Sequence, residues 1–367
     1  MKLHELIVKV AETGLDSQKS DGSMPPGKNG PYNDIETPVR NTSHWAITFV
    51  KAFQITSQDK FKKSALACTE YLSGQKARPH GKTFWHRESK SKDKCNGLIG
   101  QAWSIESICV VSNALKIPEL ADLATEIFHL HPFNSKRKLW NRVEIDGVIL
   151  SIDETFNHQL WFAAAASMIN GNDTEIVHHR IKLFLKGIQE NIAQYKNGLI
   201  GQSIKTKKTI HYNNNLFLLL KIFVAQLIQS KQKRNWSLYK SIGYHTFNLY
   251  AFALLAKKFG QDLIWPEKIV TNALSYAKSY EFTNQIKENE FGYPYNPPGF
   301  ELPLALIELE KDKSKIDQNY ISKLLSNQLT MNFNFENYMM DKNTHDPATH
   351  TARIYEATRL PDLNFFI

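Results

Sequence analysis

The stretch Asp21–Trp45, DGSMPPGKNGPYNDIETPVRNTSHW, sets the pattern on which the fold of this chain is built. Its glycines and prolines break the backbone into turns, so acidic, basic and aromatic side chains extend from irregular structure. Thr42 or Ser43 can then cap a helix whose first turn contains His44 and Trp45. The stretch predicts a polar loop that leads directly into a helix.

The same arrangement recurs along a chain in which helical periodicity dominates and no alternating run is long enough to build a sheet. Helices with polar starts and small or aromatic bodies are expected at about 43–55, 98–114, 156–169, 243–259, 300–309 and 349–359. Amphipathic partners with charged outer faces are expected at about 2–14, 59–73, 119–130, 174–193, 266–281 and 317–329. Six such pairs predict an all-α fold, a single (α/α)6 toroid over residues 1–367 with inner helices around a central cavity.

A literal repeat accompanies these pairs. Asn96–Gln101, NGLIGQ, recurs as Asn197–Gln202, 101 residues later. Identical hexapeptides indicate reused local geometry, although a helix follows only the first copy and a lysine-rich run follows the second.

Composition limits the classes of protein to which the chain can belong. Three cysteines without a C-x-x-C pattern argue against a disulfide scaffold or a zinc ribbon, and they fit a reducing compartment. The N-terminus mixes charges into an amphipathic helix rather than a signal peptide, so we expect a cytoplasmic protein. The net charge is +9, but residues 203–240 carry eight basic and no acidic residues, so the rest holds only +1. Such local basicity disfavours a nucleic-acid surface.

Within that basic segment, residues 216–228 read LFLLLKIFVAQLI. The run is too short to span a bilayer, so it is either a core helix or an interfacial one. Its basic flanks favour contact with an anionic membrane surface through residues 203–240. We therefore expect a helical insert at about 203–240 and a peripheral position at the inner face of the membrane, beside a cavity suited to a lipid-linked saccharide.

The polar helix starts, Asn157 among them, and the loops before them predict one shared cavity. The aromatic loop before the fifth of these helices offers Tyr293 or Tyr295 to a sugar ring. Its expected binding residues are Asp21, Tyr32, Arg40, His44, Trp45, Gln101, Trp103, His158, Gln159, Trp161, His245, Asn248, Tyr293, Glu301, His350 and Arg353. Each has a simpler alternative, since buried histidines are commonly structural and a glutamate in the first turn favours a helix through its dipole. Histidine pairs elsewhere lack carboxylates at ligand spacing, and no phosphate-binding or dinucleotide motif occurs, so we predict no metal and no cofactor.

Asp153 precedes a helix, ETFNHQLWFAAAA, whose later turns are small or apolar. It is either the N-cap of that helix or, in a half-desolvated cavity, a general acid or base with a raised pKa. Asp34 or Glu106 is the expected partner carboxylate.

Five motifs, the opening stretch, CNGLIGQAW, TFNHQLWFAAA, GYHTFNLYAFALL and HTARIYEATRL, resemble the Agl-cluster family of archaeal and bacterial surface-glycan loci. That family is distantly similar to unsaturated glucuronyl hydrolases, (α/α)6 toroids that use aspartate to hydrate a C4=C5 double bond in a uronic acid. The resemblance implies glycan processing and assigns Asp153 as acid and base.

Together these observations predict an enzyme that acts on an acidic, uronic-acid-containing saccharide by hydrolysis, hydration or epimerisation. Arg40 or Arg353 would hold the uronate carboxylate. Trp45, Trp103 and Trp161 would stack on sugar rings. Two alternatives are a non-catalytic scaffold that binds a glycan or its lipid carrier and a polyprenyl-processing enzyme of similar shape.

Overall fold

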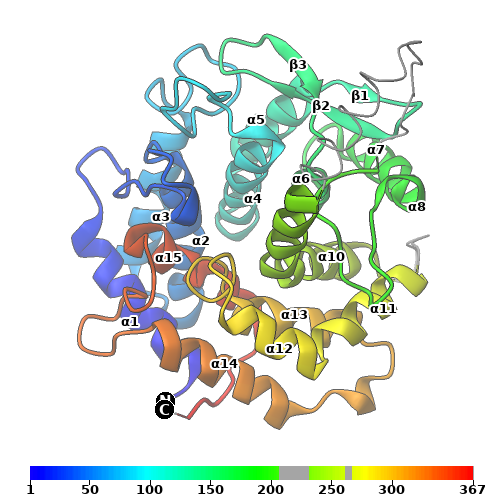
Figure 1. Ribbon diagram of the computed structural model, residues 1–367. Coiled ribbons are helices and arrows are strands. Elements are labelled where there is room, and N and C mark those ends of the chain that lie inside the picture. The colour runs from blue at the N-terminus through cyan, green and yellow to red at the C-terminus, as the bar shows by residue number, and fades with distance from the viewer. Residues whose placement is uncertain (206–230, 261–266, 367) are drawn as a thin grey trace, which may run out of the picture.

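The computed structural model describes residues 1–205, 231–260 and 267–366, and its helices form a ring around a central axis (Figure 1). The inner helices are α2 (Val39–Thr56), α4 (Gly97–Leu115), α6 (Phe156–Ala166), α10 (His245–Phe259), α13 (Pro298–Leu309) and α15 (Pro347–Ala352), which continues into the 3-10 helix η4 (Arg353–Arg359). Each inner helix contacts the next, and both α15 and η4 contact α2, so the ring is closed. The predicted all-α toroid is confirmed.

The outer layer packs one helix against each inner helix. It consists of α1 (Leu3–Ser17), α3 (Asp59–Ser73), α5 (Pro118–Leu130), α7 (Thr174–Lys186), α11 (Glu267–Ala277) and α14 (Gln318–Asn332), with the short elements η1 (Gly30–Tyr32), α8 (Ile188–Asn191), α12 (Tyr280–Lys287) and η3 (Lys313–Lys315) between them. The chain ends lie together (Figure 1), where the Leu3 amide donates to the Leu363 carbonyl at 2.9 Å.

Apart from their ends, the inner helices are buried on all sides, which the sequence of α6 illustrates. Its alanines, 163–166, are fully buried and let α6 approach α4 and α10 closely. Trp161 is also fully buried and stacks on Phe247 and Tyr250 of α10, at centroid distances of 4.4 and 5.6 Å.

The first inner helix begins earlier than predicted, at Val39 rather than near His44. Pro38 starts it, because its fixed φ suits the first turn of a helix. The hydroxyls of Thr42 and Ser43 therefore do not cap this helix. Both donate to carbonyls one turn back, at 2.7 and 2.8 Å.

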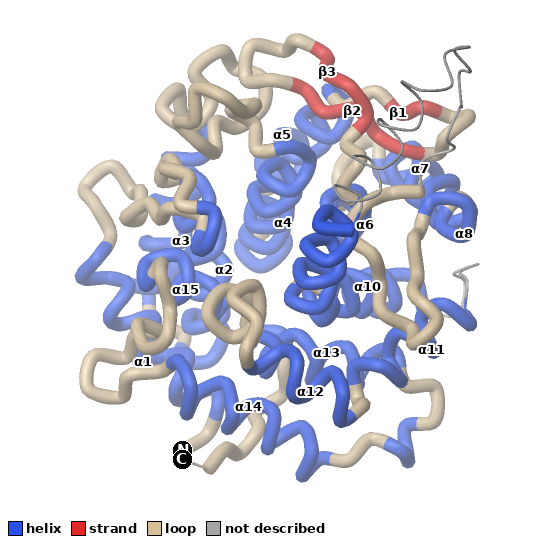
Figure 2. The backbone as a smooth tube through the Cα atoms, viewed as in Figure 1, coloured by secondary structure: helices blue, strands red, loops and turns tan. Residues whose placement is uncertain are grey.

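A small antiparallel sheet departs from the prediction that the chain contains no sheet (Figure 2). Its strands are β1 (Phe133–Asn134), β2 (Leu139–Val143) and β3 (Ile149–Ile152), in the order β1-β2-β3. They are too short, and β3 too exposed, to give a clear alternating pattern. The sheet matters for the site because β3 ends at the residue before Asp153.

Most of the predicted insert lies outside the described residues, including the whole apolar run 216–228. Its described ends are 203–205 and the helical residues from 231. Among the described residues, no helix has both the length and the apolar character that a membrane span requires. The membrane contact of residues 203–240 stays a prediction.

Candidate functional site

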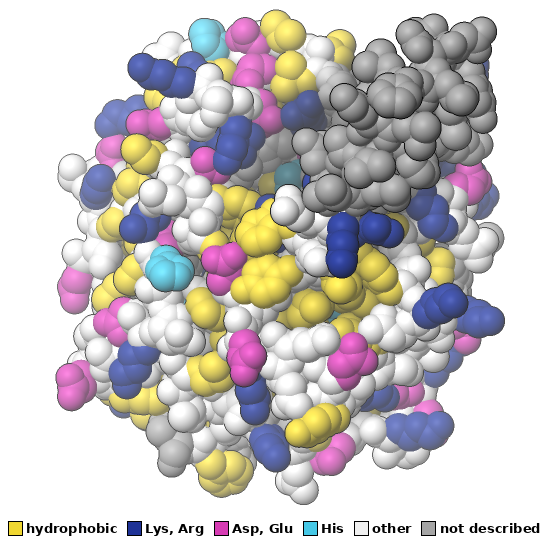
Figure 3. Space-filling model, viewed as in Figure 1, with side chains coloured by type: hydrophobic (Ala, Val, Ile, Leu, Met, Phe, Trp, Pro, Cys, Tyr) yellow, Lys and Arg dark blue, Asp and Glu magenta, His cyan; other side chains and the backbone are white. Residues whose placement is uncertain are grey.

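A cavity of about 220 Å³ lies where the loops before the inner helices meet the first turns of those helices. Figure 3 shows hydrophobic side chains gathered near the centre of this face, with acidic and basic side chains beside them. Eight residues predicted from the sequence line the cavity. They are Tyr32, Asp34, Arg40, Trp103, Asn157, His158, Tyr295 and Arg353.

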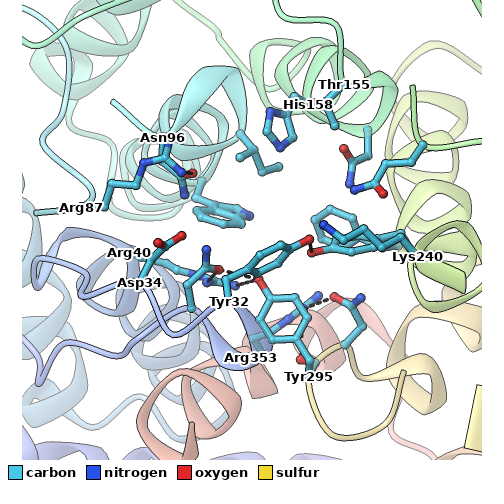
Figure 4. Close-up of a pocket in the computed structure, with 18 of the residues that line it drawn as sticks. Tyr32, Asp34, Arg40, Arg87, Asn96, Thr155, His158, Lys240, Tyr295 and Arg353 are labelled. Carbon is cyan, nitrogen blue, oxygen red and sulfur yellow. Dashed lines mark hydrogen bonds between the residues drawn. The ribbon is translucent and has the colours of Figure 1, made fainter. Parts of the chain in front are cut away.

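His158 and Asp153 form a hydrogen-bonded pair at the start of α6. The Asp153 carboxylate accepts from His158 Nδ1 at 2.9 Å, and it also accepts from the backbone amides of Leu98 and Thr155 at 3.0 and 3.1 Å. A carboxylate only accepts, so Nδ1 carries a proton, and in the neutral ring Nε2 is the nitrogen with the free lone pair. The His158 ring points into the cavity (Figure 4), whereas Asp153 lies behind it.

The electrostatics of Asp153 suit a positioning role. Burial alone would raise the pKa of this carboxyl, but the His158 ring and the two backbone amides hold it down at about 2. Asp153 is therefore ionised at neutral pH and has no proton to donate. Gly97 makes room for the pair, because a Cβ there would lie 2.6 Å from the Asp153 carboxylate and 2.9 Å from His158 Nδ1.

Arg40 lies deep in the cavity and its donors are already engaged. It donates to Asn29 at 3.0 Å, to Glu36 at 3.2 Å and to the Tyr295 hydroxyl at 3.4 Å. Its guanidinium also lies 4.0 Å from the Trp103 ring centroid. The bidentate fork is therefore held by the protein rather than open to a uronate.

Arg353 is engaged in the same way by two buried glutamates. It donates to Glu301 at 2.9 Å, to Glu356 at 2.6 and 2.9 Å, and to the side chain of Asn296. Burial raises the pKa of both carboxyls, and that of Glu301 furthest, because Glu356 repels it. Arg353 closes the inner end of the cavity and joins η4 to α13.

Two lysines stand at the shallower end. Lys92 pairs with Asp34 at 2.6 and 2.8 Å. Lys240 lies over the ring of Tyr32, with its amine 4.5 Å from the centroid, and no carboxylate of the described chain is within ion-pair distance of it. The cavity lining therefore has a positive balance, with Asp34 the one carboxylate among the described lining residues.

Tyrosines complete the wall opposite His158 (Figure 4). The hydroxyls of Tyr32 and Tyr244 are 3.0 Å apart and hydrogen bond to each other. Tyr295 donates to Asn29 at 2.7 Å. Polar side chains thus surround a space whose floor includes Trp103.

Several predicted residues hold the fold together instead of lining the cavity. Gln101 bonds to both backbone groups of Phe84, Gln159 bonds to both backbone groups of Trp140, and His245 bonds to Ile200 and Ala273. These three side chains, each near the start of an inner helix, hold neighbouring segments in place. Trp45 faces α1, Trp161 is enclosed by α10, and Asp21 pairs with Lys76 at the surface.

The remaining predicted residues are buried away from the cavity lining. They are His44, Glu106, Asn248, Tyr293, Glu301 and His350. His44 stacks on Tyr355 at 4.2 Å, and burial lowers its pKa well below the usual value. Glu106 pairs with Arg359 at 2.6 Å, and burial raises its pKa to about 7.

Other residues that line the cavity were not predicted from the sequence, and most of them come from loops and from the end of the insert. They are Asn29, Arg87, Lys92, Asn96, Ile99, Thr155, Gln202, Lys240, Tyr244, Phe247 and Asn296. Among the described residues, no group of three histidine, cysteine, aspartate or glutamate side chains could hold a metal ion.

The fold and its polar cavity define a class, the (α/α)6 toroids that include sugar epimerases and glycoside hydrolases. A cellobiose 2-epimerase from Bacillus thermoamylovorans superposes with a TM-score of 0.66 at 11% identity, over 97% of this chain and 98% of the other. An unsaturated glucuronyl hydrolase specific for heparin gives 0.57 at 10% identity, over 97% and 94%. These likenesses establish the fold.

The family to which the chain belongs within that class is shown by sequence comparison. No protein-family model matches the chain. It is, however, 40% identical over 372 aligned positions to archaeal glycosylation protein Q of Haloferax volcanii, covering 100% of this chain and 99% of that protein. The chain belongs to the archaeal glycosylation protein Q family, in agreement with the Agl-cluster motifs.

Proposed function

We propose that the chain is an enzyme of glycan metabolism that binds an acidic saccharide in the central cavity and transfers a proton on it with His158. The observation that carries this proposal is the pair of Asp153 and His158, whose free nitrogen faces a cavity with a positive balance of charge. Membership of a family named for glycosylation supports the saccharide.

The roles of the two residues follow from their protonation. Asp153 stays ionised, so we move the acid and base role assigned to it from the sequence onto His158. Asp153 then selects the tautomer that leaves Nε2 basic and stabilises the imidazolium after proton transfer.

Among the three reactions predicted from the sequence, epimerisation next to a uronate carboxylate fits these residues best. Glycoside hydrolysis commonly uses two carboxylates that flank the bond, whereas Asp34 is the one carboxylate that lines the described part of the cavity. Epimerisation removes the proton beside the carboxylate with one base and returns a proton to the opposite face from a second group, and it needs nearby cations for the charge that develops on the carboxylate. His158 supplies the base, and the paired hydroxyls of Tyr32 and Tyr244 on the opposite wall return a proton to the other face. The arginines that line the cavity supply the positive charge.

Mass spectrometry in deuterated water tests the proposal on uronate oligosaccharides, lipid-linked uronate glycans and unsaturated uronides. We expect one deuterium to enter the uronate residue without any larger mass change, and His158→Gln to reduce that rate by about 10²- to 10⁴-fold while the circular dichroism stays unchanged. His245→Gln is a control for loss of a buried histidine outside the cavity.

The alternative functions predict a different mass change or no mass change. Addition of one water would indicate hydration or hydrolysis and overturn epimerisation. Saccharide binding that is equal in wild type and His158→Gln, with no turnover of any substrate by either protein, would favour the non-catalytic scaffold.

A further inference from the structure

Two lysine amines approach one aromatic ring at the mouth of the cavity. Lys240 Nζ lies 4.5 Å from the centroid of the Tyr32 ring, and Lys92 Nζ lies 5.9 Å from it. The Lys240 amine is also 5.2 Å from Trp236 and 5.3 Å from Phe291. Aromatic faces attract an ammonium group and pack against its aliphatic stem. The position of Lys240 is therefore fixed by three rings.

The charges at this point do not balance. Asp34 neutralises Lys92, but no described carboxylate pairs with Lys240. Burial and the charge of Lys92 lower the pKa of Lys240, and Glu290 offsets them only in part. Holding two ammonium groups around one carboxylate is unfavourable unless a further anion joins them. The arrangement has the excess positive charge of an anion-binding site.

We propose that Lys92 and Lys240 form a subsite for a phosphate ester carried by the saccharide. This rests on the proposed function in one respect, namely that the sugar attached to the phosphate occupies the cavity beneath. The two lysines are at the shallow end, since the Lys92 side chain is 41% exposed, whereas those of Arg40 and Arg353 are 1% and 2% exposed.

Position and chemistry separate this anion from the uronate carboxylate. The uronate must approach His158, whereas an anion at the mouth belongs to the group by which the sugar is attached. A compact ammonium binds phosphate as a point charge and needs no planar fork. A phosphate ester also links the sugar to a second group, and Trp236, half exposed beside Lys240, offers a ring face to that group.

Calorimetry with purified protein tests the subsite without any need for turnover. The probes are glucuronic acid, glucuronic acid 1-phosphate, a nucleoside diphosphate glucuronate and a short-chain isoprenyl phosphate glucuronide. We expect Lys240→Gln to weaken binding of the phosphorylated probes about tenfold and that of glucuronic acid little. Lys240→Arg should retain most of the affinity. Lys257→Gln, whose amine pairs with Glu308 outside the cavity, should match wild type.

The outcomes are distinguishable. Tighter binding of the nucleotide or of the isoprenyl probe identifies the source of the phosphate. An equal loss for glucuronic acid and its 1-phosphate in Lys240→Gln would overturn the phosphate subsite, and so would no loss for either. If the lysine effect is found but no substrate turns over, the proposed catalysis fails and the subsite stands.

Discussion

Replacing Asp153 with asparagine keeps the shape of the side chain and removes its charge. In the wild type, one carboxylate oxygen accepts from both His158 and the Leu98 amide, and the other accepts from the Thr155 amide. Asparagine has a single oxygen for these three donors. If its amide nitrogen faces His158, it donates to Nδ1 and moves the ring proton to Nε2; if its oxygen faces His158, that neutral oxygen no longer stabilises the imidazolium that forms after proton transfer.

The magnitude follows from the pKa. Asp153 has a pKa of about 2 in the folded chain against an ordinary 3.8, so folding favours its ionised form by about 2 kcal/mol at neutral pH. Because the folded pKa is the lower one, this stabilisation is present above about pH 4 and is lost as the pH falls toward about 2. We expect Asp153→Asn to lower the free energy of unfolding by about 2 kcal/mol at pH 7, with a smaller difference at pH 3.

Two assays test this reasoning. Urea unfolding at both pH values, followed by tryptophan fluorescence, measures the stability difference. Deuterium exchange on the uronate substrate measures the base, and we expect a fall of about 10²- to 10⁴-fold. Glu154→Gln, an exposed neighbouring carboxylate, is the control and should change neither. A variant that exchanges deuterium at the wild-type rate would refute the tautomer argument.

Two further substitutions test the same geometry and the buried acids. Gly97→Ala should reduce deuterium exchange at least tenfold, because the new methyl group meets both Asp153 and His158. Gly81→Ala is the control, because Gly81 has a similar positive φ of 62° but no neighbour within 4 Å. It should lower the free energy of unfolding by the backbone cost of about 1 kcal/mol and keep full activity. Equal effects of the two substitutions on exchange would contradict the steric account. Burial raises the pKa of Glu106 from 4.5 to about 7 in the folded chain. Between about pH 4.5 and 7 the carboxyl is therefore ionised in the unfolded chain but protonated in the folded one, so the wild type loses stability as the pH rises. Glu106→Gln does not titrate and should gain stability relative to wild type over this range. Unfolding curves with a pH-independent difference would show that Arg359 already holds Glu106 as a full ion pair.

The toroid could be predicted because inner and outer helices differ in composition throughout their length. The ends of helices were less certain, since Pro38 starts α2 while the better capping residues, Thr42 and Ser43, bond within it. The sheet escaped notice because β1 and β3 are two and four residues long. Local composition decides whether a helix belongs to the inner or the outer layer, whereas its first residue depends on one or two backbone groups.

The position of the cavity could be predicted from the sequence, but only some of the residues that line it could. Gln101 and Gln202 end identical hexapeptides, yet Gln101 is buried against the Phe84 backbone and Gln202 lines the cavity. Both copies have a glycine at positive φ that approaches another segment closely, Gly97 toward Asp153 and Gly198 toward the Asn272 carbonyl. The repeat therefore specifies a tight turn, and the role of its last residue is set by the elements that pack on that turn.

The same distinction explains why carboxylates were easy to find and hard to assign. Glu36, Asp153, Glu301 and Glu356 all lie behind the cavity and bond to Arg40, His158 or Arg353, which face it. These acids fix cationic and imidazole groups in position, and they also occupy the guanidinium forks that a uronate would otherwise use. The cations that remain to select an anionic ligand are the two lysines. Lys240, fixed by rings instead of by an acid, keeps its charge available to the ligand.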